Sequence, residues 1–64
     1  MEAKYKTDDT FDYTFTDRYH LKHTREGHIL DVLTTENSAG ETVRIEYVFE
    51  YMYEGNNKIA TVEQ

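Results

Sequence analysis

One segment, residues 42–54, restricts the fold more than any other part of the chain. Apolar and aromatic side chains occupy every second position in it, and polar side chains occupy most of the positions between. The first set is Val43, Ile45, Tyr47, Phe49, Tyr51 and Tyr53. Successive side chains of a β-strand point to opposite faces, whereas a helix would scatter this set around its circumference. We therefore predict a strand from Thr42 to Glu54.

This predicted strand is long for a globular protein. At about 3.3 Å per residue it would extend for about 43 Å, whereas strands usually contain about 3–10 residues. We therefore expect a bend or a β-bulge within it, which would let the strand serve two halves of a curled sheet or of a small open barrel.

A hairpin is predicted immediately before this strand. Residues 37–40 form its loop, in which Gly40 is free to take a positive φ. If Glu36 pairs with Glu41, the apolar faces of the two strands coincide. The pairs are then Thr34 with Val43, Val32 with Ile45 and Leu30 with Tyr47, and Ile29 and Leu33 lie on the reverse face.

Three further segments complete the expected sheet. Residues 25–28 are predicted as a second tight turn, and residues 55–57 as a third turn that leads into a short strand over 58–63. Phe11, Tyr13 and Phe15 alternate with polar residues and predict a strand over 10–16. After it, Asp17 and Arg18 either turn into the next strand or form a kink, because the odd-numbered pattern continues through His23. Residues 2–7 could add an edge strand.

The predicted fold is all-β: a small antiparallel meander of about five strands, as a curled sheet or a small open barrel. A helix over 27–36 is the alternative, and its β-branched residues disfavour it. We expect one domain over residues 1–64, with 1–9 frayed. The 64-residue chain contains no cysteine and supports only a thin core, so self-association as a homodimer or larger assembly is a further expectation.

The charge balance limits the classes of partner. Thirteen acidic residues oppose seven basic ones, which gives a net charge of −6. Nucleic-acid phosphates repel such a chain, so we expect no direct nucleic-acid partner. No apolar stretch approaches the roughly 20 residues of a membrane span, and no apolar run follows the first residues. We therefore expect a cytoplasmic protein without a membrane partner.

The sequence contains no persuasive catalytic set. His20 and His23 would point to opposite faces of a strand, and His23 with His28 would lack a third metal ligand, so we predict no metal site. The carboxylates among residues 8–17 are expected to be solvated, because so short a chain can hardly build a deep cleft around them. Neither a phosphate-binding loop nor a nucleophile motif is present. We predict no enzyme activity and no cofactor.

The tyrosines indicate a binding surface. Six tyrosines are too many to bury in a thin core, because each buried hydroxyl needs a partner. Tyrosine also supplies much of the binding energy at protein interfaces. We predict that exposed tyrosines surrounded by carboxylates contact a protein partner. The predicted partner-binding residues are Tyr51, Tyr53, Glu46, Glu50 and Glu54.

The resulting hypothesis is a small acidic non-enzymatic protein that acts by protein–protein interaction. In its most specific form it is an inhibitor of the phage or mobile-element type, a DNA mimic whose carboxylates occupy the basic surface of a nucleic-acid-processing host enzyme. One alternative is a self-assembling structural β-protein. A second alternative is a small metal-binding or sugar-binding β-domain.

Overall fold

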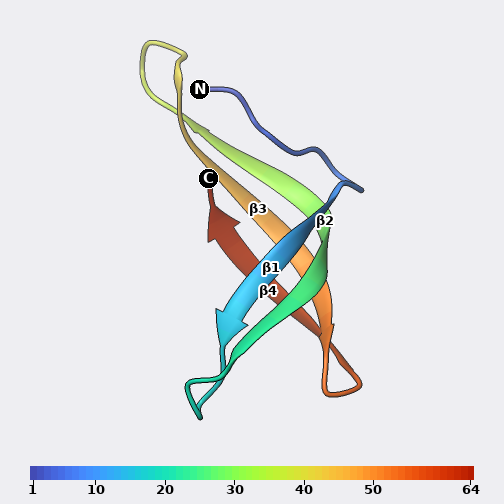
Figure 1. Ribbon diagram of the computed structural model, residues 1–64. Coiled ribbons are helices and arrows are strands. Elements are labelled where there is room, and N and C mark those ends of the chain that lie inside the picture. Colours follow the sequence, from blue (N-terminus) through green and yellow to red (C-terminus); the bar gives the residue numbers. More distant parts are fainter.

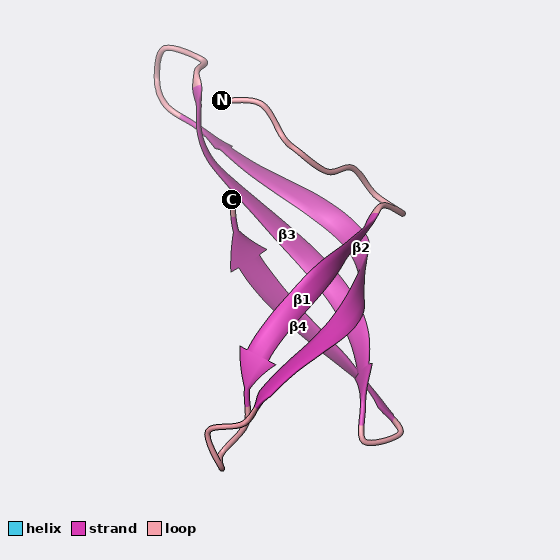
Figure 2. Ribbon diagram, in the orientation of Figure 1, coloured by secondary structure: helices cyan, strands magenta, loops and turns pink.

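The computed structural model describes residues 1–64 and contains four antiparallel strands and no helix (Figures 1 and 2). The strands are β1 (Thr10–Thr16), β2 (Lys22–Glu36), β3 (Thr42–Tyr53) and β4 (Asn56–Glu63), and they follow one another in the sheet in chain order. The predicted antiparallel meander is confirmed, with four strands instead of about five and with the sheet left open. None of its elements is a helix that could cross a membrane.

The sheet is long and strongly twisted. Its principal extents are 44 × 24 × 15 Å, and its radius of gyration of 13.7 Å exceeds the value of about 11 Å typical of a compact chain of this length. Figure 1 shows β1 crossing in front of β3 and β4, with β2 bending around one side of the crossing. The curl brings the apolar faces of β1 and β3 together although β2 separates the two strands.

Two rows of aromatic rings interdigitate inside this curl. One row comes from the N-terminal segment and β1, and the other comes from β3. Because β1 and β3 are both antiparallel to β2, the rows run in the same direction and match in order. The facing rings, with centroid distances, are Tyr5–Tyr47 at 5.4 Å, Phe11–Phe49 at 4.9 Å, Tyr13–Tyr51 at 5.0 Å and Phe15–Tyr53 at 5.1 Å. These contacts replace the second layer that a flat sheet would need.

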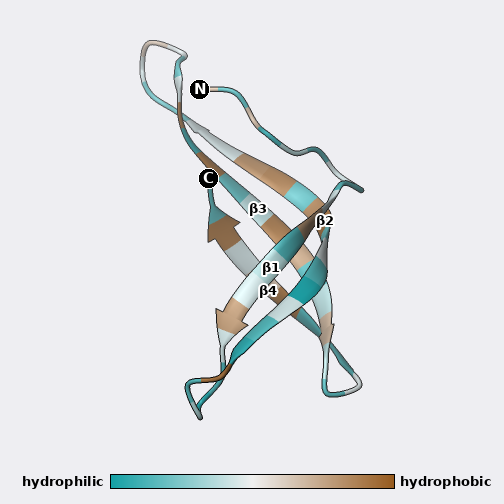
Figure 3. Ribbon diagram, viewed as in Figure 1, coloured by the Kyte–Doolittle hydropathy of each residue, from teal (hydrophilic) through white to brown (hydrophobic).

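The fully buried core is small and lies at the middle of β2 and β3. It consists of Ile29, Ile45, Tyr47 and Phe49, so the predicted apolar face of β3 is confirmed over these central positions. Two expectations were wrong. Val43 was expected in the core and is 51% exposed, and Ile29 was expected on the reverse face and is fully buried. Brown and teal bands alternate along the strands in Figure 3, as this single-faced core requires.

A bulge at Leu30 explains the position of Ile29. Ile29 pairs with Phe49 and Asp31 with Val48, so Leu30 has no partner in the ladder. The extra residue exchanges the two faces of β2: Ile29 points into the curl before the bulge, and Val32 packs against the same core after it. A uniform alternation along β2 could not predict this exchange.

The predicted register of the β2–β3 hairpin is also corrected. Thr34 pairs with Ile45 and Val32 with Tyr47, two residues away from the predicted pairs. The expected irregularity in β3 is present at Val43, which the ladder skips between Thr42 and Arg44. The two-residue shift preserves the faces of the strands, which is why the apolar pattern alone could not distinguish the two registers.

The predicted turn at residues 25–28 is wrong, because β2 runs through this segment without a break. Gly27 lies in the strand opposite Phe11. A Cβ at Gly27 would be 2.7 Å from Phe11 Cε1, so the glycine provides room for a ring and no change of direction. The chain reverses earlier, at Asp17–Leu21, which was one of the two open predictions for that segment.

The other two connections also contain residues with positive φ. The predicted loop over residues 37–40 is confirmed, with Gly40 at φ 80°. The third turn lies one residue earlier than expected: Glu54 and Gly55 have φ values of 52° and 76°, and Tyr53 pairs with Asn56. Positive φ at both central residues is the geometry that matches the twist of a two-residue hairpin.

The first nine residues form no strand but are attached to the sheet. The Asp8 amide donates to the Ile29 carbonyl, and the Ile29 amide donates to the Asp9 carbonyl. Tyr5 packs on the core, and the Lys4 amide donates to the Tyr47 hydroxyl over 2.9 Å. The same hydroxyl donates to the Gln64 side chain, so both ends of the chain close over the ring of Tyr47.

Candidate functional site: an aromatic groove at one end of the sheet

A groove of about 600 Å³ lies at the end of the molecule where the β1–β2 loop and the β3–β4 turn meet. The last aromatic residues of β1 and β3 supply its apolar lining, and the two connections supply its polar lining. Its aromatic side chains are Phe15, Tyr19, His23, Tyr51 and Tyr53, and its charged side chains are Asp17, Arg18, Glu54 and Lys58.

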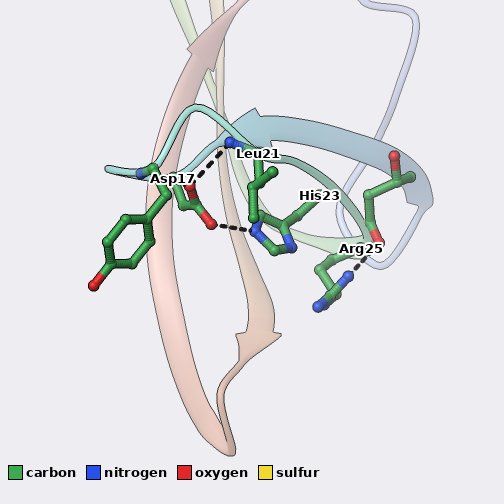
Figure 4. A network of polar contacts seen from close by, with 6 residues as sticks. Asp17, Leu21, His23 and Arg25 are labelled. Carbon is green, nitrogen blue, oxygen red and sulfur yellow. Dashed lines mark hydrogen bonds and ion pairs between the residues drawn. The ribbon is translucent and has the colours of Figure 1, made fainter.

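Asp17 holds the loop side of the groove in place (Figure 4). Its Oδ1 accepts hydrogen bonds from the amides of Tyr19 and Leu21 over 2.7 and 3.0 Å. Its Oδ2 accepts a bond from His23 Nε2 over 2.7 Å. An aspartate that receives local backbone amides stabilises a tight turn, and the third bond fixes the imidazole of His23 at the start of β2.

His23 continues the aromatic lining. Its ring stacks on Phe15 with a centroid distance of 5.4 Å and meets the edge of Tyr53 at 5.1 Å. Phe15 in turn lies 5.3 Å from Tyr51. These side chains are partly exposed, so the ring rows that form the core continue to this end of the molecule without a cover.

Hydroxyl groups distinguish the tyrosines of the groove from the tyrosine of the core. The Tyr47 hydroxyl is bonded to Gln64 and to the Lys4 amide. The only side-chain partner of the Tyr53 hydroxyl is the neighbouring Glu54 carboxylate, and neither the Tyr51 nor the Tyr53 hydroxyl is buried without a partner. Two hydrogen-bonding groups at the groove are therefore available to a ligand.

The groove shifts the pKa of two of its own groups. The hydrogen bond from His23, followed by that from the Leu21 amide, lowers the pKa of the Asp17 carboxyl, which stays ionised. Burial, followed by the charge of Glu54, raises the pKa of the Tyr53 hydroxyl, which stays protonated. The groove therefore contains an ionised carboxylate, Asp17, that already accepts three hydrogen bonds, and a neutral phenol, Tyr53.

Two of the three predicted carboxylates lie away from these tyrosines. Glu46 and Glu50 project from the opposite face of β3, and both have partners within the chain: Arg44 Nη2 lies 3.2 Å from Glu46, and His28 Nδ1 lies 3.0 Å from Glu50. Glu50 also accepts a bond from Asn57. Glu54 is the one predicted carboxylate that the structure brings to Tyr51 and Tyr53.

The histidines considered as metal ligands lie apart. His23 binds Asp17 in the groove, whereas His28 lies on the other face, with Nε2 3.1 Å from Asp8 and Nδ1 3.0 Å from Glu50. The two carboxylates bind opposite ring nitrogens of His28, so the three groups cannot share one ion. No group of three potential ligands converges anywhere in the structure.

Sequence reasoning identified Tyr51 and Tyr53 but missed the other half of the groove. Phe15 was predicted only as a residue of the strand over 10–16, and Asp17 and Arg18 were treated only as a turn or a kink. One signal was available in the sequence. Asp17 lies three residues before His20, as Asn37 lies three residues before Gly40, and the two segments form loops of the same type. The misplaced turn at residues 25–28 concealed this similarity.

Fold and site together define an open, curled four-stranded β-sheet whose aromatic core reaches the surface at one end. Comparison of the chain with known protein families, curated proteins and solved structures found no match.

Proposed function

We propose that this chain is a small non-enzymatic binding protein that docks on another protein through the aromatic groove. The observation that supports this most directly is the continuation of the core rings into an uncovered groove that is lined by two tyrosines, Tyr51 and Tyr53. Tyrosine combines a large apolar ring with a polar end at little cost in side-chain entropy, and interfaces are enriched in it. A cytoplasmic location and an inhibitory role belong to the same proposal.

The groove is a better candidate for the contact surface than the carboxylate row. A phosphate mimic needs unpaired carboxylates, and internal partners already engage Glu46 and Glu50. Tyr51 and Tyr53, in contrast, have hydroxyls at the groove, and the only side-chain partner of the Tyr53 hydroxyl is the neighbouring Glu54. We therefore place the contact surface at the groove end, with Tyr51, Tyr53 and Glu54 retained from the set predicted by sequence.

The test is capture of a partner from a bacterial lysate by the immobilised 64-residue chain. We expect Tyr53→Ala to weaken binding of the captured protein by about thirtyfold, the effect of a hot-spot truncation. Met52→Ala is the matched control, because Met52 is the neighbouring residue on the opposite face of β3 and is 54% exposed. Equal losses for the two variants would contradict a binding site in the groove.

An inhibitory role requires a second measurement on the captured protein. If that protein is an enzyme, the wild-type chain should lower its activity and the Tyr53→Ala variant should not. Urea unfolding of both chains serves as the control for folding, because Tyr53 lies at the end of β3 and outside the buried core.

Self-assembly is the second candidate, and the open sheet supports it. β1 and β4 each leave one edge without a neighbour in the sheet. Such edges are ready to pair with another strand, and neither strand contains proline. Sedimentation across micromolar concentrations tests this candidate: a monomer throughout would exclude it, whereas a dimer would support it.

A further inference from the structure

The outer edge of β4 has no neighbour in the sheet. Among the strands, β4 contacts only β3. The Gln64 amide donates to the Ile45 carbonyl over 2.9 Å, which extends the β3–β4 register by one pair. Hydrogen bonding alternates from residue to residue along an antiparallel ladder, so the even-numbered residues of β4 bond to β3. The odd-numbered residues therefore direct their N–H and C=O groups to the free edge: Asn57, Ile59, Thr61 and Glu63.

Apolar side chains flank this edge on both faces of the sheet. Ile59 lies on the outer face, beside Glu50, and is 67% exposed, whereas Val62 lies on the core face and is 36% exposed. A free edge of this kind pairs readily with another strand unless proline or charge protects it. β4 contains no proline, and its two charged residues, Lys58 and Glu63, lie toward its two ends.

The chain exposes more surface than a compact monomer of its mass. Its accessible surface is 4839 Å², whereas about 4,300 Å² is typical of a 7.6 kDa protein. The difference of about 500 Å² is close to the area that one partner contributes to a small protein interface, up to about 600 Å². An interface of that size would bring the exposed surface of each chain to the ordinary value.

The charge pattern favours β4 over β1 as the strand that pairs with a second copy. Asp12 lies in the middle of β1 and pairs with Glu26 of β2. Pairing of two β1 strands about their centre would bring these carboxylates together, and like charges in such positions are destabilising. In β4, Lys58 and Glu63 have opposite signs, so antiparallel pairing places the basic end of each strand beside the acidic end of the other.

We propose that two copies of this chain pair through antiparallel β4 strands about a two-fold axis at Ala60, which gives a continuous eight-stranded sheet. Ala60 then faces Ala60 of the second copy, and Ile59 exchanges two backbone hydrogen bonds with Thr61 of the second copy. The two Ile59 side chains become diagonal neighbours on the outer face, within reach of each other. An axis at Thr61 would instead place Ile59 opposite Glu63 and separate the two isoleucines.

This pairing also extends the aromatic groove. Lys58 lines the groove, and in this register it lies opposite Val62 of the second copy, whose side chain adds apolar surface beside it. Because the strands are antiparallel, the two grooves lie at opposite ends of the dimer. The inference rests on the proposed function, since it gives the self-assembly candidate a strand and a register and leaves both grooves open to a partner protein.

Disulfide cross-linking tests the register, because the chain contains no cysteine. Directly opposite residues of a non-hydrogen-bonded pair have Cα atoms about 4.5 Å apart, within the range that a disulfide spans. We expect Ala60→Cys to form a covalent dimer under mild oxidation at micromolar concentration, measured by non-reducing electrophoresis. Ala39→Cys, at the exposed alanine of the β2–β3 loop, is the matched control and should remain mostly monomeric. Equal cross-linking of the two variants would overturn the proposal.

Sedimentation of the 64-residue chain and of two proline variants tests the edge. We expect a monomer–dimer equilibrium without larger species. Thr61→Pro removes an outward N–H from each strand and should weaken the dimer by about tenfold or more, because the symmetry removes two hydrogen bonds. Thr14→Pro is the matched control, since the Thr14 amide faces the free edge of β1, and it should leave the dimer unchanged. Circular dichroism should show intact strands in both variants, because neither amide is used within the sheet.

The outcomes separate this inference from docking through the groove. A monomer at all concentrations, species larger than a dimer, or a dimer that only Thr14→Pro weakens would overturn the β4 pairing. Capture of the lysate partner by the wild-type chain would then still support the groove. Loss of capture in Tyr53→Ala together with an intact, Thr61-dependent dimer would support the pairing and leave it independent of the groove.

Discussion

Gly27 lies in the middle of β2, opposite Phe11 of β1, in a position where any side chain would meet an aromatic ring. A Cβ built there would be 2.7 Å from Phe11 Cε1 and 3.0 Å from Cζ, well inside ordinary van der Waals contact. The absent side chain lets the Phe11 ring reach Phe49 at 4.9 Å. The absence of a side chain at Gly27 therefore allows the packing of Phe11 on Phe49 that closes this part of the curl.

Gly27→Ala should lower the free energy of unfolding by about 1–3 kcal/mol, the usual range for overpacking a filled core. Urea unfolding monitored by tyrosine fluorescence measures the change. The second arm is Phe11→Leu, because a smaller side chain relieves the contact: in that background, Gly27→Ala should cost less than in the wild type. Equal costs in both backgrounds would show that the Phe11 ring is not the reason for the glycine.

At the scale of elements, two loops of unrelated sequence have the same structure. In Asp17–Leu21 and in Asn37–Glu41 the first side-chain oxygen accepts two amides, and the first amide donates to the carbonyl of the last residue. The fourth residue has positive φ in both: Gly40 at 80° and His20 at 63°. Glycine adopts this conformation without strain, whereas histidine does not.

This difference predicts opposite effects for reciprocal substitutions. His20→Gly should raise the free energy of unfolding by about 1 kcal/mol, and Gly40→His should lower it by about the same amount, because a side chain is strained in the left-handed region. Thermal and urea unfolding of the two variants provide the measurement. A loss of stability in His20→Gly would show that the imidazole contributes a contact that outweighs the strain.

The sequence pattern reveals the strands of this fold more readily than their irregularities. Alternation predicted β3 and its buried face, because a period of two leaves few other solutions over Ile45 to Phe49. The alternation could not reveal the bulge at Leu30, because an unpaired residue exchanges the two faces of β2 while the amino-acid composition of the strand stays the same. Gly27 was misread for a physical reason: glycine serves both turns and close ring packing, and only the position of Phe11 distinguishes them. Half of the groove was missed for the same reason: Gly27 was taken for a turn residue, which placed the chain reversal at residues 25–28 instead of at Asp17–Leu21.

At the scale of the whole molecule, His28 connects three parts of the chain. It lies on β2, its Nδ1 is 3.0 Å from Glu50 on β3, and its Nε2 is 3.1 Å from Asp8 in the N-terminal segment. An ionised carboxylate only accepts hydrogen bonds, so both ring nitrogens must donate, and only the imidazolium has two N–H groups. The arrangement therefore holds the N-terminal segment, with Tyr5 over the core, most firmly when His28 is charged.

The pH dependence of stability follows from these bonds. The hydrogen bond to Glu50, followed by that to Asp8, raises the pKa of His28 above its ordinary value of 6.5. The contribution of His28 to stability is therefore complete below pH 6.5 and is lost as the pH rises through the raised pKa. The bond from His28 lowers the pKa of Glu50 below 4.5, so the contribution of Glu50 is present above pH 4.5 and is lost as the pH falls through the lowered pKa.

We therefore expect the free energy of unfolding to decline as the pH rises above 6.5 through the raised pKa of His28, and His28→Gln to remove most of that decline. Urea unfolding at several pH values measures it. His20→Gln is the matched control, because His20 forms no ion pair and its loss should leave the decline unchanged. Hydrogen exchange locates the effect: the Asp8 and Ile29 amides, which join the N-terminal segment to β2, should exchange faster at high pH than the amides of the β2–β3 ladder. If His28→Gln declines as steeply as the wild type, the imidazolium does not hold the segment, and the closure over Tyr47 depends on Gln64 and the Lys4 amide alone.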